Sequence, residues 1–311
     1  MRIVVHGQQA FGKSVLEALL ERGENVVGVY CAPEAADGRG RVDPLKEAAL
    51  DRGLPVKQPR SFRKDPAVRE EFARLEADLC VMAYVTLIVP EDVLNLPTRG
   101  TIQYHPSLLP RHRGPSSINW PIIMGETRTG LTIFWPDNGL DTGPILLQKG
   151  VEIRDGDTLG SLYFDQLYPL GVAALLEAVD MVRAGSAPRI VQDETQATYE
   201  GWCKKEHVQI DWHQPLPQIW NLIRGADPQP GAWTTYEGAI VQLLEARKRV
   251  GAVTAPPGEV TVVDDEGLTI AAPGGQIQVT RIRPDGGQKI NAGAFAKSAG
   301  LRPGARLGSP R

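Results

Sequence analysis

Short apolar runs alternate with helical patterns over the first 150 residues of the chain. The apolar runs predict strands at residues 2–6, 25–30, 54–57, 77–84 and 101–105. Between them, apolar residues three or four positions apart predict helices at residues 13–22, 44–52, 66–75 and 90–94. This alternation is typical of βαβ units, so we expect an α/β domain built on a mostly parallel sheet.

The pattern changes beyond residue 145. Residues 145–147 form a short apolar strand, and an apolar stripe at helical spacing predicts one long helix over residues 158–184. The polar, proline-containing stretch at residues 185–202 predicts a linker. We then expect a strand at residues 207–212, a helix at residues 215–224 and a turn at residues 228–234. From Val241 onward, short β-rich runs separated by Gly, Pro and Asp favour a small all-β barrel or sandwich.

The composition is that of an ordinary globular protein. With 311 residues, 42% hydrophobic and 23% charged, the chain is long enough for two domains. No apolar run approaches the roughly 20 residues of a membrane helix, and the N-terminus lacks the pattern of a signal peptide. The three cysteines, Cys31, Cys80 and Cys203, are far apart and match no metal spacing. We therefore expect a cytoplasmic protein with reduced thiols and no membrane partner.

Charge is unevenly distributed along the chain. Residues 241–311 contain ten Lys or Arg against six Asp or Glu, a balance of +4, whereas the whole chain has −3 and the remainder therefore −7. A mildly basic C-terminal region could contact a phosphate backbone. An ordinary solvated surface is the alternative interpretation.

The segment from Gly7 to Ser14 matches G-x-x-x-x-G-K-S, the phosphate-binding P-loop, between an expected strand and an expected helix. Against a nucleotide-binding role, the loop has no glycine between its ends and Phe11 is a poor neighbour for phosphates. No isolated Asp at a strand end follows for magnesium. We therefore favour a tight strand–helix turn in which Gly7 and Gly12 allow close packing.

Two segments concentrate the polar chemistry. The first, residues 102–114, places His105 after a strand and before a proline turn; the second, residues 134–148, holds Asp141 in a Gly-Leu-Asp-Thr-Gly loop. Open α/β sheets place their chemistry at strand ends, so the two side chains could form an acid–base pair that transfers protons. Gln103 shares a face with His105, because strand residues two apart lie on one side, and its amide could donate to an oxyanion.

Each of these residues also has a purely structural interpretation. Asp141 could cap a turn, and Gln103 could be an ordinary strand glutamine. The default interpretation of the basic cluster of Arg111, His112 and Arg113 is a solvated loop. The functional alternative is that the cluster binds an anionic substrate tail. The aromatic residues Tyr104, Trp120 and Trp135 are expected in the core or a pocket wall.

At these residues the sequence resembles the 10-formyltetrahydrofolate-dependent formyltransferase family. It is similar to methionyl-tRNA formyltransferases and to the hydrolase domain of 10-formyltetrahydrofolate dehydrogenase. The matching stretches are HPSLLPRHRG, INW, GLDTGPILLQ, ATYEG, KKE, IDW, PGAWT and the ending GLRPGARLG, spread over about 300 residues. The resemblance implies a Rossmann-like formyltransferase domain at residues 1–184, a linker at residues 185–206 and a C-terminal OB-like β-barrel domain at residues 207–311.

The resemblance also implies site residues and a reaction. The family's catalytic trio is an Asn, a His two residues later and the loop Asp; His105 and Asp141 match, whereas Gln103 replaces the Asn. The implied donor is 10-formyltetrahydrofolate, with no metal. Its binding segments would be Leu87, Ile88 and Val89 in one loop, and Ser107, Leu108, Leu109 and Pro110 in another, together with Asp141. His105, oriented by Asp141, would stabilise the oxyanion, and Asp141 would relay the proton to the leaving N10.

The formyl acceptor stays open at this point. The size of the chain and its basic C-terminal region favour methionyl-tRNA, and a small amine such as an amino sugar or amino acid is a further candidate. The short loop at residues 36–45, with only Arg39 and Arg41, is closer to the hydrolase domain, in which water replaces the amine. A folate-binding or P-loop protein without formyl chemistry is the third alternative.

Overall fold

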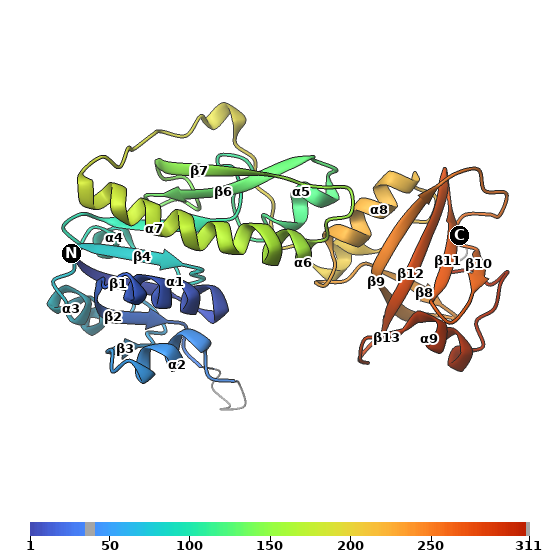
Figure 1. Ribbon diagram of the computed structural model, residues 1–311, viewed down its shortest axis with the longest axis horizontal. Coiled ribbons are helices and arrows are strands. Elements are labelled where there is room, and N and C mark those ends of the chain that lie inside the picture. The colour runs from blue at the N-terminus through green and yellow to red at the C-terminus, as the bar shows by residue number, and fades with distance from the viewer. Residues whose placement is uncertain (35–40, 309–311) are drawn as a thin grey trace. The chain divides into compact units, whose positions relative to one another are not determined.

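The computed structural model describes residues 1–34 and 41–308 (Figure 1). The chain folds into two compact units. The first comprises Met1–Gly114, Gly130–Val151 and Asp165–Tyr199, and the second comprises Pro115–Thr129, Glu152–Phe164 and Glu200–Arg311. The chain thus enters the second unit twice before its C-terminal third. The domain boundaries expected from the sequence stay predictions.

The first unit is an α/β sandwich around a seven-stranded sheet with the strand order β3-β2-β1-β4-β5-β6-β7. Strands β1 to β5 are parallel, and β6 runs antiparallel to β5. The strands are β1 Arg2–Gly7, β2 Asn25–Cys31, β3 Val56–Lys57, β4 Leu79–Ala83, β5 Thr101–His105, β6 Arg128–Phe134 and β7 Ile145–Glu152. The helices are α1 Gln9–Glu21, α2 Pro44–Asp51, α3 Pro66–Arg74, α4 Glu91–Leu94, α7 Tyr168–Ala184 and the short η2 Glu194–Gln196.

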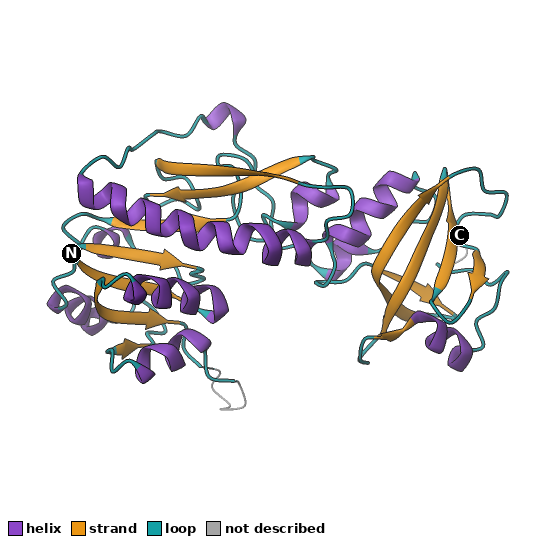
Figure 2. Cartoon of the chain, viewed as in Figure 1, coloured by secondary structure: helices purple, strands orange, loops and turns teal. Residues whose placement is uncertain are grey.

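The alternation of side chains along the strands explains the two layers of helices (Figure 2). In β1, Ile3 and Val5 belong to the core that α1 and α7 share, whereas Val4 faces the opposite core, with Phe72 of α3. Every residue of β4 is buried, as the sequence predicts for a strand covered on both faces. The predicted Rossmann-like fold class is confirmed for this unit.

The second unit is an antiparallel sheet with the strand order β10-β11-β12-β9-β8, which matches the predicted small β domain. Its core joins α8 residues such as Ile219 and Ile223 to strand residues such as Leu243 and Ile277. The strands are β8 Trp233–Tyr236, β9 Ala239–Val250, β10 Val260–Val263, β11 Leu268–Ala272, β12 Gly275–Pro284 and β13 Ile290–Asn291. The helices are α5 Asn119–Ile123, α6 Leu159–Ser161, η3 Lys205–Val208, α8 Leu216–Gly225 and α9 Ala292–Ala299.

Two predicted elements are corrected by the structure, and others were missed. The single helix predicted over residues 158–184 is broken, because a π-helical turn, η1 Leu162–Leu167, separates α6 from α7. The strand predicted over residues 207–212 is wrong: η3 covers its start, and a single bridge from Gln209 to Trp233 replaces a ladder. Elements α5, β6 and α9 were not predicted.

The P-loop-like segment is a tight turn. Strand β1 ends at Gly7 and α1 begins at Gln9, so only Gln8 lies between them. A Cβ atom at Gly7 would lie 2.3 Å from the Ala83 carbonyl oxygen, which shows why glycine is needed there. Phe11 is buried against Tyr104, with their ring centroids 4.5 Å apart. The packing interpretation is therefore correct, and this segment leaves no room for a phosphate-binding loop.

Across the described parts of the chain, no helix combines the length and apolar character needed to cross a bilayer.

Candidate active site

His105 is the last residue of β5, and its ring is enclosed by the turn that follows. Its Nε2 lies 2.9 Å from the backbone oxygen of His112. A carbonyl oxygen only accepts hydrogen bonds, so Nε2 carries a proton and donates it. The remaining ring nitrogen, Nδ1, faces Asp141.

Asp141 lies in the loop between β6 and β7, with Oδ2 at 3.6 Å from His105 Nδ1. Both side chains are only 7% exposed. The same Oδ2 accepts a hydrogen bond from the backbone N–H of Gly114 at 2.8 Å. Because Nε2 holds a proton, Nδ1 is the ring nitrogen that can accept a further one, on the side that faces the Asp141 carboxylate. The two segments singled out in the sequence thus bring a base and a carboxylate together in a buried position.

The loop around Asp141 needs its glycines and an unusual backbone. Asp141 has φ = +57°, the left-handed region that side-chain-bearing residues rarely adopt and that Asp tolerates better than most. A Cβ atom at Gly143 would lie 1.8 Å from the Trp135 carbonyl oxygen. The Gly-Leu-Asp-Thr-Gly pattern is thus required by the path of the chain.

Gln103 is paired with Phe134 of β6 and Met82 of β4 through the sheet register, and its side chain is half-buried. Within residues 1–34 and 41–308, no group forms a hydrogen bond with its side-chain amide. Its strand position puts it on the face of β5 that bears His105. The amide is available to a ligand.

The four residues expected to bind folate after His105 differ in their exposure. Ser107 is fully buried and donates its hydroxyl to the Arg111 carbonyl oxygen at 2.7 Å. Leu109 is 3% exposed and packs with Phe134 and Ile145. Leu108 and Pro110 are half-buried. Of this loop, only Leu108 and Pro110 can offer side chains to a ligand, and Ser107 and Leu109 can offer backbone groups.

The second expected folate segment follows β4. Leu87 and Val89 pack against the core cluster on the α3 side of the sheet. Ile88 between them is 70% exposed, and Tyr84 at the start of the loop is 46% exposed. This loop and the turn after His105 both follow the carboxyl ends of neighbouring parallel strands, β4 and β5. The structure therefore brings the two expected segments to one edge of the sheet, where open α/β sheets bind ligands.

The basic cluster after this turn is not the solvated loop that the sequence favours by default. His112 and Arg113 are buried, at 3% and 7% exposure, and Arg111 alone is exposed. Arg113 forms an ion pair with Glu194 at 2.6 Å. Tyr104 and Trp135 are core residues, as predicted.

Comparison with known proteins identifies the family. Residues 1–179 match the model of the formyl transferase family, and residues 203–300 match that of the formyl transferase C-terminal domain. A methionyl-tRNA formyltransferase from Geobacter metallireducens is 36% identical, over 99% of both chains. The chain belongs to the formyl transferase family. The resemblance in its motifs is thereby confirmed.

Other relatives of this chain are much longer proteins. Mouse mitochondrial 10-formyltetrahydrofolate dehydrogenase is 43% identical over 83% of this chain, which spans 28% of that protein's length. A crystal structure of HypX from Aquifex aeolicus in complex with tetrahydrofolic acid superposes with a TM-score of 0.70. The two sequences are 21% identical, and the match covers 95% of this chain and 47% of the HypX chain. At this identity the similarity shows a shared fold only.

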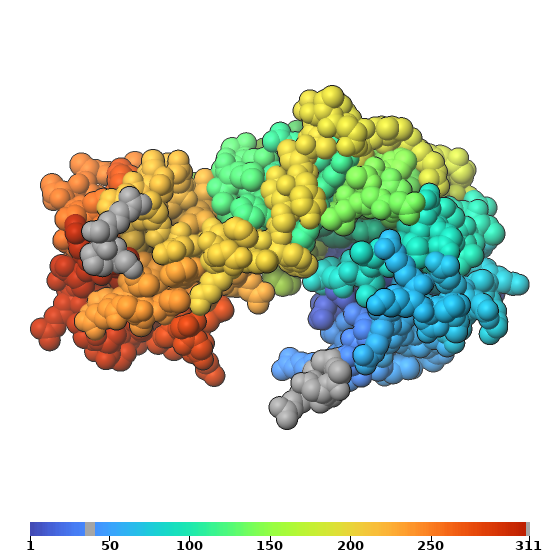
Figure 3. Space-filling view, turned by 180° about the vertical axis from the view of Figure 1, so that it is seen from behind, coloured from blue at the N-terminus to red at the C-terminus, as the bar shows by residue number. Residues whose placement is uncertain are grey.

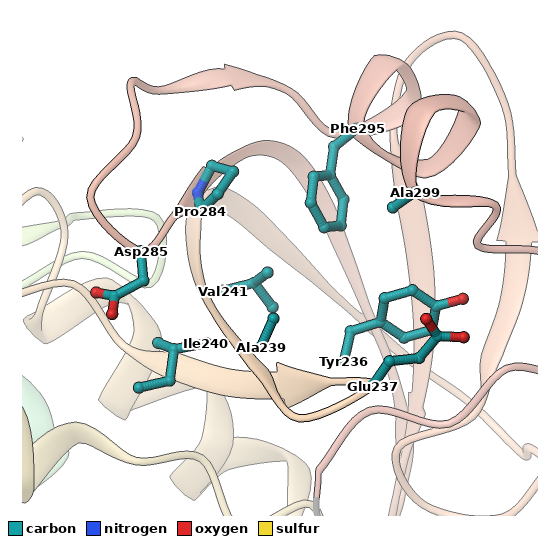
Figure 4. A pocket seen from close by; sticks show the side chains of 9 residues that line it. All are labelled: Tyr236, Glu237, Ala239, Ile240, Val241, Pro284, Asp285, Phe295 and Ala299. Atoms are coloured by element: carbon teal, nitrogen blue, oxygen red, sulfur yellow. The ribbon is translucent and has the colours of Figure 1, made fainter.

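The second unit of the chain contains a cavity of about 360 Å³ (Figure 4). Its lining comes from β8, β9, β12 and α9 and includes Tyr236, Val241 and Phe295. Its carboxylates are Glu237 and Asp285, and Asp285 is paired with Lys205 at 3.1 Å. None of the residues that line this cavity belongs to residues 102–114 or 134–148, the two segments that hold His105 and Asp141.

No group of three or more His, Cys, Asp or Glu side chains that could hold a metal ion occurs in the described part of the chain. All three cysteines are buried and free of disulfide bonds. Burial raises the pKa of the Cys31 and Cys203 thiols to about 11 and that of Cys80 to about 12. They are therefore protonated and poor nucleophiles.

Proposed function

We propose that this chain takes the formyl group from 10-formyltetrahydrofolate and transfers it to an amine, with methionyl-tRNA as the first acceptor to test. The observation that supports the chemistry is the buried pair of Asp141 and His105, of which His105 lies on the strand that also carries the unengaged amide of Gln103. The full-length methionyl-tRNA formyltransferase relative supports the choice of acceptor.

A reduced folate fits the described residues. Its ring system is flat and largely apolar, and Tyr84 and Ile88 expose apolar side chains on the loop after β4. The turn after β5 offers backbone groups and the partly exposed Leu108 and Pro110 at the same sheet edge. A ligand held between these loops would have its formyl group near Gln103 and His105.

The residues divide the work of acyl transfer in this proposal. The amine nitrogen attacks the formyl carbon, which gives a tetrahedral intermediate with a negative oxygen. The Gln103 amide stabilises that oxygen by hydrogen bonding, and the His105 ring, when protonated, stabilises it by its charge. Asp141 accepts a proton from the attacking nitrogen and passes it to N10, and the bond between the formyl carbon and N10 breaks. The products are the formylated amine and tetrahydrofolate.

A basic strip in the second unit supports an RNA acceptor. Arg247 and Arg249 are exposed on β9, and Arg281 is exposed on the neighbouring β12. Arg249 also donates to Gln278 across the strand pair at 2.8 Å. Phosphate contacts from such residues would make binding weaken as salt rises. Of the short loop at residues 36–45, Arg39 lies outside the described residues.

Hydrolysis of 10-formyltetrahydrofolate to formate and tetrahydrofolate is the second candidate. Two observations favour it: Gln103 stands where the family has Asn, and the dehydrogenase relatives are 40–46% identical to this chain. The glutamine side chain is one methylene longer, and a displacement of about 1 Å of the amide costs on the order of 100-fold in rate. In this reading water takes the place of the amine.

One assay separates the two candidates. The purified chain is incubated with 10-formyltetrahydrofolate, with and without charged methionyl-tRNA, and released tetrahydrofolate and formyl-methionyl-tRNA are measured. A transferase releases tetrahydrofolate only with the acceptor present, in step with formylated tRNA. A hydrolase releases it at the same rate in both reactions. No turnover with either, together with no folate binding, would refute the proposed function.

A further inference from the structure

We infer that Gln192, held in place by Arg113, positions Asp141 for proton transfer. This inference rests on the proposed function, because it assigns a positioning role within the same site. We call Arg113, Gln192 and Glu194 the brace. All three lie in the first unit, as Asp141 does.

The brace belongs to a segment that lies across both loops of the site. After α7, residues 186–199 run beside β7 and the turn after His105, and they appear in yellow over the green middle of the chain (Figure 3). Ile190 exchanges two backbone hydrogen bonds with Ile145 at the start of β7. Thr198 accepts a hydrogen bond from the Arg113 N–H through its carbonyl oxygen and one from the His112 N–H through its hydroxyl. The segment predicted as a linker is thus attached to both site loops.

Gln192 is the contact between this segment and the Asp141 loop. Its side chain is 5% exposed. Its Nε2 donates to the Asp141 carbonyl oxygen at 2.9 Å and to the Gly143 carbonyl oxygen at 2.8 Å. These two bonds hold the Asp141–Thr142 and Gly143–Pro144 peptide groups, in the three residues that begin at the catalytic carboxylate.

Arg113 determines which way the Gln192 amide points. Its Nε and Nη2 donate to Gln192 Oε1 at 3.2 and 2.8 Å. With the oxygen held by the guanidinium, both N–H groups of the amide must face the carbonyl oxygens of the loop. Glu194 accepts from Arg113 Nη1 and Nη2 at 2.9 and 2.6 Å, a two-point contact that fixes the guanidinium plane.

Asp141 has particular need of such support. Its backbone, at φ = +57°, costs free energy for a residue with a side chain and persists only where the surroundings enforce it. Arg113 is followed by Gly114, whose N–H holds the Asp141 carboxylate directly. The brace therefore fixes Asp141 from both sides, through its backbone by Gln192 and through its carboxylate by the residue next to Arg113.

The test uses Gln192→Glu, which keeps the side-chain shape but removes both N–H donors, with Gln192→Ala as a second variant. Gln196→Glu makes the same charge change at an exposed position of the same segment and serves as the control. Hydrogen exchange of the Gly114 amide and of residues 139–145 is measured, with the amides of β1 and β4 as a reference for the fold. This readout needs no enzymatic activity.

We expect exchange at Gly114 and in the Asp141 loop to rise about 10-fold or more in both Gln192 variants, because buried acceptors lose their donors. Exchange in β1 and β4 stays as in the wild type, and Gln196→Glu changes neither region. In the turnover assay, kcat falls at least about 10-fold, KM for the folate changes less than about 3-fold, and the pH profile of kcat shifts, because the group that moves protons is displaced.

The outcomes separate the brace from the proposed function. Unchanged exchange at Gly114 and residues 139–145 in both Gln192 variants would overturn the inference. If the wild type is active, an unchanged kcat and an unchanged pH profile of kcat in both Gln192 variants would also overturn the inference. A wild-type protein without turnover would refute the proposed function, and the exchange measurement would still decide whether Gln192 holds the Asp141 loop.

Discussion

The ring of His6, at the end of β1, is a buried base whose burial makes stability depend on pH. It is 3% exposed and packs against Phe62 and Tyr30, at centroid distances of 5.4 and 6.1 Å. Burial lowers its pKa from 6.5 to about 3. The folded chain therefore keeps His6 neutral, whereas the unfolded chain takes up a proton below pH 6.5. The stability that His6 permits is complete above pH 6.5 and is lost as the pH falls toward 3.

The size of the effect follows from these two pKa values. Protonation of His6 stabilises the unfolded state by about 1.4 kcal/mol for each pH unit below 6.5. At pH 5, ~1.5 units below 6.5, the free energy of unfolding is therefore about 2 kcal/mol lower than at pH 7.5. His6→Phe keeps an aromatic ring in the cluster but has no group that titrates. We predict that its free energy of unfolding falls by about 2 kcal/mol less than that of the wild type when the pH is lowered from 7.5 to 5. Urea unfolding at both pH values measures this double difference for the unit that contains β1. Equal losses in the two proteins would refute the reasoning, whatever the stability of His6→Phe at pH 7.5.

Two further predictions concern packing and thiol chemistry. Gly7→Ala would put a Cβ atom 2.3 Å from the Ala83 carbonyl oxygen, and we expect it to cost at least ~1–3 kcal/mol of unfolding free energy. Gly156→Ala, where a Cβ atom meets nothing within 4 Å, should stay within ~0.5 kcal/mol in the same denaturation experiment. We also expect the native protein to react with a thiol reagent at least ~100-fold more slowly than a free thiol. Three equivalents should react after unfolding, at Cys31, Cys80 and Cys203.

Most of the α/β unit could be predicted from the sequence, because its strands are buried and its helices are amphipathic. β5 was predicted with its observed bounds, and the pairing of His105 with Asp141 follows from two segments meeting at a sheet edge. Strand β6 was missed although it contains Leu131, Ile133 and Phe134 around Thr132, a composition typical of a strand. The break between α6 and α7 was not predicted, because buried leucines, Leu162 and Leu167, continue through the π-helical turn without a glycine or proline to mark it.

The strand predicted at residues 207–212 failed for an instructive reason. Val208, Ile210 and Trp212 are buried alternately, as the period-two pattern predicts, and Trp212 donates to Thr234 at 3.0 Å. Burial at alternate positions does not by itself produce a ladder, which also needs a partner strand alongside. Gln192 could not be found from the sequence at all, because its partner Asp141 is 51 residues away and only the fold brings them together.

The most direct test of the account compares wild type with Asp141→Asn in 10-formyltetrahydrofolate binding and turnover. Asn keeps an acceptor for the Gly114 N–H but cannot accept the proton that the proposed mechanism assigns to the Asp141 carboxylate. We predict a loss of roughly 10²–10⁴-fold in turnover, with folate affinity within about threefold of wild type. Asp265→Asn, which removes an exposed carboxylate, should behave as wild type. Wild-type turnover by Asp141→Asn would contradict the central claim.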